Sequence, residues 1–98
     1  MKIISSQRYL DEKIVNEKIT MLGDELTLEV WAVGDFDDRT DLAILFDGNH
    51  RLAAAQAMEI PVRFEIVEQP ENLTGERLLE SCWMDSDYFY VETGRNVW

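Results

Sequence analysis

The sequence predicts a compact α+β fold, a single domain with a small mixed sheet of four to five strands and three short helices. Three observations indicate this class. The chain has 98 residues, which is enough for one domain. Hydrophobic residues make up 46% of it, the share of an ordinary globular protein. Apolar and alternating segments are interleaved with segments of helical periodicity, and no repeat or linker divides residues 1–98.

The N-terminal third of the chain predicts a strand, a helix and a second strand. Residues 2–5 are mostly apolar and predict a short first strand. Residues 10–23 predict a helix that ends at a glycine, with its apolar side chains near one face: Ile14, Ile19 and Leu22. Residues 26–33 alternate in polarity, which predicts a strand whose two faces differ.

A central strand and a tight turn follow. Residues 34–41 are dense in aspartate and glycine, which is typical of a turn. Residues 42–46 are uniformly apolar, as in a strand that is buried on both faces. Because the link between the two strands is short, we expect them to pair in antiparallel orientation.

The second half predicts two helices and two strands. An alanine-rich helix is expected at 49–58 and a strand at 61–67, with three inward side chains: Val62, Phe64 and Ile66. Residues 76–84 predict a short helix with Thr74 as its N-cap. Residues 87–98 predict a final strand and turn whose aromatic side chains close over the core.

Acidity is the strongest compositional feature. Nine Lys and Arg against 20 Asp and Glu give a formal net charge of −11. Residues 1–34 hold four basic and six acidic groups, and residues 35–98 hold five and fourteen. Because nucleic-acid binding depends on cationic groups that displace counterions, we expect no direct binding to duplex DNA. The same charge favours solubility or docking on a basic protein partner.

Three further features bear on location. No apolar run approaches the ~20 residues of a membrane span, so we expect no membrane association. The start of the chain lacks an apolar signal core. Cys82 is the only cysteine and cannot form an internal disulfide, so a reducing cytoplasm is the expected location.

The turn Asp47–Arg51 concentrates the polar chemistry of the chain. Gly48 permits a positive φ and a close approach of ligand to backbone. Asn49 is a favoured N-cap residue, and the first amides of a helix attract anions. Arg51 adds a fork of donors suited to phosphate. His50 either adds a donor or proton carrier with Asp47 as its partner, or only forms a hydrogen bond with the backbone. This pattern predicts a phosphate pocket. The alternative is an ordinary capped turn in which Arg51 pairs with Asp47 or another acid.

Residues 47–67, DGNHRLAAAQAMEIPVRFEIV, resemble the signature segment of the ParB/sulfiredoxin superfamily. The resemblance implies a nucleotide or phosphate site at Gly48, Asn49, His50 and Arg51. It also implies ATP or CTP with Mg²⁺ as the ligand, with weak nucleotide hydrolysis. In this interpretation His50 orients the ligand or moves a proton, and Asp47 holds Arg51 or Mg²⁺.

The segment also departs from the family pattern. Sulfiredoxins place their catalytic cysteine where this chain has Asn49, so sulfinic-acid repair is not predicted, and Cys82 is expected to be a small buried hydrophobe. Partition proteins carry two adjacent arginines where this chain has His50 and Arg51, and their helix-turn-helix does not follow. Chromosome partition by this chain alone is therefore not expected. Glu59 stands where a helix-ending glycine is expected, and a left-handed backbone there would cost about 1 kcal/mol.

Two other functions compete with phosphate binding. A metal-dependent nuclease would use converging carboxylates, and the acidic turn offers Asp35, Asp37, Asp38 and Asp41. A solvated acidic turn is the stronger interpretation, because no cationic path for a nucleic acid is evident. The other alternative is a non-catalytic acidic protein-interaction module, for example one encoded by a mobile element.

The C-terminal tail is rich in aromatic residues, namely Trp83, Tyr88, Phe89, Tyr90 and Trp98. Covering the sheet is their expected role. An aromatic cluster with an acidic rim also suits a partner-binding face or the stacking of a nucleotide base. Arg95 in this tail is a second candidate phosphate ligand.

Overall fold

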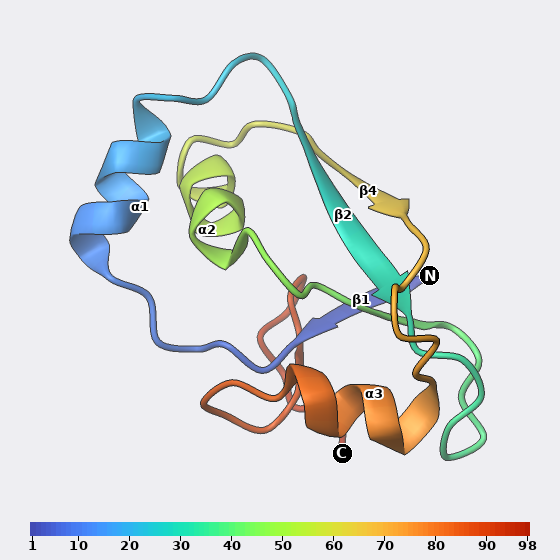
Figure 1. Cartoon of the computed structure of the whole chain (residues 1–98). Helices are drawn as coiled ribbons and strands as arrows, with labels where there is room; N and C mark the ends of the chain where they lie inside the picture. The colour runs from blue at the N-terminus through green and yellow to red at the C-terminus, as the bar shows by residue number, and fades with distance from the viewer.

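Eight elements follow one another in the computed structural model, which describes residues 1–98 (Figure 1). The predicted single α+β domain with a mixed sheet and three helices is confirmed. None of the helices combines the length and the apolar character that a membrane span requires. In chain order the elements are β1 (Lys2–Ser5), α1 (Glu12–Ile19), β2 (Leu26–Ala32), β3 (Leu42–Ile44), α2 (Asn49–Ala57), β4 (Val62–Ile66), α3 (Gly75–Cys82) and β5 (Phe89–Tyr90).

The five strands form one sheet in the order β4-β2-β3-β1-β5. The expected antiparallel pairing of β2 with β3 is present, and Trp31 lies opposite Ile44. β3 also pairs with β1 in parallel, and β2 pairs with β4 in parallel. β5 closes the far edge antiparallel to β1. The sheet is therefore mixed, with β3 at its centre.

Helices cover both faces of the sheet, and each face has its own apolar cluster. α2 lies on one face with α1 beside it, and α3 lies on the other (Figure 1). The α2 cluster contains Ile3, Leu28, Val30, Ala43, Leu45 and Leu52. The α3 cluster contains Ile4, Val33, Leu42, Ile44, Leu78, Leu79 and Tyr88. Because successive residues of 42–45 point alternately into the two clusters, this segment is apolar throughout, as the sequence predicted.

The two helices on the α2 face differ in burial. Ala54 and Ala55 of α2 are fully buried, and their small side chains let the helix approach the sheet closely. α1 buries no residue completely and packs against α2. It is shorter than the predicted 10–23, because Asp11 caps it and accepts a hydrogen bond from the Lys13 backbone N–H at 2.9 Å. The chain then leaves the helix after Ile19.

One local expectation was wrong, and two others were confirmed with differences in detail. Ile66 was expected to point inward but is 55% exposed, because β4 is an edge strand and only Val62 and Phe64 reach the α2 cluster. The final strand of 87–98 is limited to β5, since the chain turns back and the Gly94 N–H donates to the Tyr90 carbonyl. Thr74 is the N-cap residue of α3, as predicted, although its side chain makes no capping hydrogen bond.

Glu59 has a φ of 55°, in the left-handed region, at the helix end where a glycine was expected in place of the glutamate. The Glu59 N–H donates to the Gln56 carbonyl and the Ile60 N–H to the Ala55 carbonyl. These two bonds form a Schellman motif, in which the left-handed residue is usually glycine. The strain expected at this helix end is thus present.

Glu59→Gly is expected to raise the free energy of unfolding by about 1 kcal/mol, because glycine removes the cost of the left-handed Cβ. Urea denaturation measures the change. Ala57→Gly, at an exposed helical position two residues earlier, is the control and should lower stability by about 0.5–1 kcal/mol. A loss of stability in both variants would show that Glu59 makes a compensating contribution.

Candidate functional site

Gly48 is the point at which the chain turns from the central strand into α2. It is the N-cap residue of the helix, with φ 89° and ψ 18°. A Cβ at this position would lie 2.8 Å from Leu28 Cδ2 and 3.1 Å from Arg51 Nη2. Both the backbone conformation and the packing therefore require glycine here.

The first amides of α2 are open. No side chain caps the helix, and Leu52 is the first residue whose N–H bonds back to the turn, donating to the Gly48 carbonyl at 2.9 Å. The backbone N–H groups of Asn49, His50 and Arg51 have no acceptor within the protein. They lie at the positive end of the helix dipole, which favours an anion.

Arg51 makes no ion pair. The one salt bridge of the structure joins Arg39 to Asp41 at 3.3 Å, so the alternative in which Arg51 pairs with Asp47 is not observed. The guanidinium lies beside Gly48 and lines a hollow of about 250 Å³ to which Lys18 and Glu25 also contribute. Two cationic side chains and one carboxylate therefore border this hollow, and Arg51 is the residue of α2 that lines it.

Asn49 has a structural role that the sequence did not predict. The expected N-cap is wrong by one residue, because Asn49 is the first helical residue and Gly48 is the cap. The Asn49 side chain is only 8% exposed, and its Oδ1 accepts a hydrogen bond from Ser5 Oγ at 2.8 Å. Ser5 Oγ in turn accepts from the Gln7 N–H at 3.1 Å. The Asn49 amide thus ties α2 to the end of β1.

His50 and Asp47 make separate contacts. The Asp11 backbone N–H donates to His50 Nε2 at 3.1 Å, so the second ring nitrogen, Nδ1, carries the proton. Asp47 Oδ1 accepts from the Gly48 N–H at 2.8 Å. The imidazole therefore joins α2 to the residue that caps α1, and no hydrogen bond joins Asp47 to His50.

The structure thus leaves three groups free to bind a ligand: the guanidinium of Arg51, the backbone amides of 49–51 and the second carboxylate oxygen of Asp47. Sequence reasoning missed three contributors, Ser5, Asp11 and Lys18. Asp11 carries a local signal as the residue before a helix, but nothing in its neighbourhood points to His50. Their roles depend on contacts between segments that lie far apart in the chain.

The other candidate residues lie elsewhere. Asp41 is paired with Arg39, whose hydrogen bond lowers the pKa of the Asp41 carboxyl, and Asp37 accepts from the Trp98 indole N–H. No three His, Cys, Asp or Glu side chains converge as metal ligands would.

Cys82 is half-buried against the α3 cluster, and burial raises the pKa of its thiol. Arg95 lines a separate hollow of about 580 Å³ together with Lys2.

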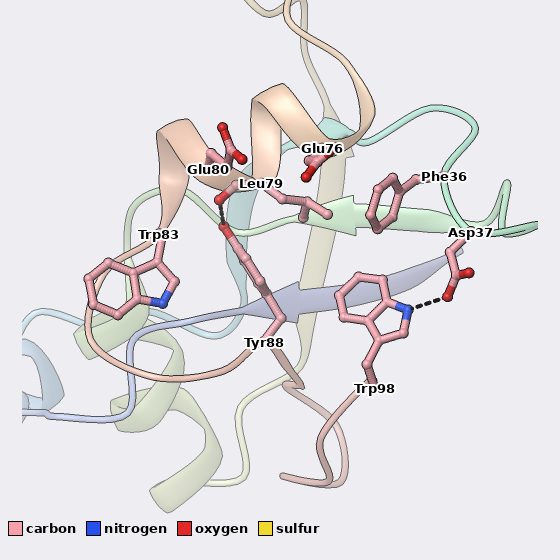
Figure 2. A pocket seen from close by; sticks show the side chains of 8 residues that line it. All are labelled: Phe36, Asp37, Glu76, Leu79, Glu80, Trp83, Tyr88 and Trp98. Atoms are coloured by element: carbon pink, nitrogen blue, oxygen red, sulfur yellow. Dashed lines mark hydrogen bonds between the residues drawn. The ribbon is translucent and has the colours of Figure 1, made fainter.

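The aromatic tail divides between core and surface. Tyr88 is buried in the α3 cluster, and its hydroxyl donates to the Leu79 carbonyl (Figure 2). Burial raises the pKa of Tyr88 to about 12. Trp83 and Trp98 remain 57% and 52% exposed. The expected covering of the core therefore holds for Tyr88 but only in part for the two tryptophans.

No protein-family model, curated protein or solved structure matches the chain. The resemblance to the ParB/sulfiredoxin superfamily therefore rests on residues 47–67, and the function that it implies is a proposal.

Ser5→Ala is expected to lower the free energy of unfolding by about 1–3 kcal/mol, because it leaves the buried Asn49 oxygen without its donor. Chemical denaturation monitored by circular dichroism measures the loss. Ser81→Ala, at an exposed position of α3, is the control and should change stability by less than about 0.5 kcal/mol. Equal effects of the two substitutions would show that the Ser5–Asn49 bond contributes little.

The raised pKa of the Tyr88 hydroxyl predicts that the stability of the protein depends on pH. Its pKa in the folded protein is about 12, above the ordinary tyrosine value of about 10. The contribution of Tyr88 to the free energy of unfolding is therefore complete below about pH 10 and is lost as the pH rises through about 12. The stability of the unmodified protein should fall relative to Tyr88→Phe across this range, as measured by urea denaturation at each pH. A constant difference between the two proteins would contradict the buried phenol.

Proposed function

We propose that this chain is a nucleotide- or phosphate-binding domain of the ParB/sulfiredoxin type that binds its ligand at the start of α2. One observation carries the proposal. Three backbone amides without acceptors and a guanidinium without a carboxylate partner occur at the same turn. Helix N-termini favour anions through their free N–H groups and their dipole. Arg51 adds charge and paired donors.

Each residue of the turn has a distinct part in this proposal. Gly48 provides the left-handed turn into α2 and makes room for Leu28 and Arg51, and the amides of 49–51 donate to the phosphate oxygens. Arg51 supplies charge, and Lys18 borders the same hollow. The Asn49 and His50 side chains act as positioning groups, because each is already bonded within the protein. The phosphate is therefore recognised mainly by backbone and cations.

ATP or CTP with Mg²⁺ is the ligand that the resemblance implies. Magnesium commonly binds through one or two carboxylates together with substrate phosphates. Asp47 provides one carboxylate at this turn, and one of its oxygens already accepts from the Gly48 N–H. The residues present therefore fit a magnesium ion that is held mostly by the phosphates.

Weak hydrolysis, as the resemblance implies, fits these contacts better than rapid turnover. His50 can take up a proton at Nε2 only by giving up its bond with the Asp11 N–H. Proton transfer at this residue is therefore coupled to a change in how α1 is held. Binding is the primary function that we propose.

Calorimetric titration with ATP, CTP, GTP and inorganic phosphate, each with Mg²⁺, tests the proposal. Arg51→Ala is expected to weaken binding by roughly tenfold or more, because it removes a charged hydrogen-bonding partner. Arg63→Ala, on the exposed side of β4, is the charge-matched control and should leave binding unchanged. An absence of binding at millimolar ligand, or equal losses in both variants, would overturn the proposal.

A non-catalytic acidic protein-interaction module is the second function that we propose. The observation that favours it is the position of three carboxylates, those of Asp37, Glu76 and Glu80, beside exposed tryptophans next to α3. The net charge of −11 favours a basic partner. The two functions use opposite faces of the sheet, so they do not exclude each other.

A further inference from the structure

A hollow of about 680 Å³ lies along α3, on the face of the sheet opposite α2 (Figure 2). We call it the α3 groove. Leu79 and Tyr88 form its floor, with Trp83 at one end and Phe36 and Trp98 at the other. The Tyr88 hydroxyl is already bonded to the Leu79 carbonyl, so the floor offers mainly apolar surface.

The aromatic end of the α3 groove is held in place. Phe36 and Trp98 meet edge to face, with ring centroids 5.5 Å apart and planes at 88°. The Trp98 indole N–H donates to the Asp37 carboxylate at 2.8 Å, as Figure 2 shows. This bond orients both the ring and the acid. The groove therefore presents an ordered aromatic surface with a negative charge beside it.

Every charged residue at the rim of the α3 groove is acidic. Asp37, Glu76 and Glu80 line it, and no lysine or arginine does. Glu76 and Glu80 are four residues apart on α3, a spacing at which like charges destabilise a helix. A cation bound at the rim would relieve this repulsion. The groove therefore combines an apolar floor, exposed aromatic faces and carboxylates.

We propose that the α3 groove binds an arginine-containing basic segment of a partner protein. Arginine suits all three features, because its stem covers apolar surface, its planar head stacks on aromatic rings, and its paired donors bind carboxylates. The inference names the surface and the partner chemistry of the interaction module proposed above, and it rests on that function. It is independent of phosphate binding at α2.

Titration of the intact chain with a short arginine-glycine repeat peptide tests this inference. Trp83 and Trp98 lie in the groove, so tryptophan fluorescence reports binding directly, and calorimetry gives the affinity. A matched peptide with citrulline in place of arginine keeps the shape but removes the charge, and it should bind at least about tenfold more weakly.

Variants of the groove separate specific docking from general charge attraction. Glu76→Gln with Glu80→Gln is expected to weaken arginine-peptide binding about tenfold. Glu12→Gln with Glu17→Gln on α1 is the control, because it removes the same charge and Glu12 occupies the first turn of α1 as Glu76 does in α3. The control should change the affinity by less than about twofold, since exposed charges far from a ligand are screened.

A further pair of variants tests the aromatic contribution. Trp83→Leu keeps an apolar side chain but loses the ring face, and it should weaken binding about fivefold. Because Trp83 is largely exposed, the fold should tolerate the change, which circular dichroism verifies. Trp31→Phe, outside the groove, is the control and should keep the affinity.

The outcomes distinguish this inference from the function on which it rests. Equal losses in the two glutamine double variants would overturn docking in the α3 groove and leave an acidic module that attracts basic partners by overall charge. An absence of binding by the arginine peptide would overturn both the groove and the interaction module. Nucleotide titration of the same groove variants should be unchanged, so neither result bears on the α2 site.

Discussion

The buried side chain of Asn49 and the hydroxyl of Ser5 determine where α2 begins. Ser5 ends β1, next to the central strand, and Asn49 opens the helix 44 residues later. Their hydrogen bond fixes the first turn of α2 to the sheet, so the open amides face a defined direction. Ser6, the next residue, accepts from the Met84 N–H and bonds Ser86, which holds the chain after α3. The end of β1 thus holds the start of α2 on one face of the sheet and the segment after α3 on the other.

The two faces of the sheet carry opposite chemistry. On the α2 face, Arg51 and Lys18 border a hollow together with Glu25, within a chain whose net charge is −11. On the α3 face, carboxylates surround exposed aromatic rings and no cation lines the groove. The sheet separates the two surfaces, because its central strand is buried on both sides. The proposed anion site and the proposed arginine-binding groove therefore lie on opposite faces of one small domain.

Much of the fold could be predicted from local patterns. The uniformly apolar segment 42–46 indicated a strand covered on both faces, and the short acidic turn before it indicated its antiparallel partner. Burial of Ile66 could not be judged from its alternation, because an edge strand is covered along only part of its length. For the candidate site, the turn, Gly48 and the helix start were predicted correctly, while the N-cap was misplaced by one residue.

The sequence by itself determined the type of each main element and the left-handed turn at Glu59, since these depend on spacing and backbone geometry within a few residues. Only the tertiary structure decided which polar groups of the turn are already used. The partners of Asn49 and His50 are Ser5 and Asp11, and each pair lies about 40 residues apart in the chain. Hydrogen bonds between residues so far apart in the sequence depend on how strands and helices are placed in space, and no local sequence pattern encodes that placement. Arg51 remains unpaired for the same reason, because no carboxylate comes within ion-pair distance of its guanidinium, although Glu25 lines the same hollow.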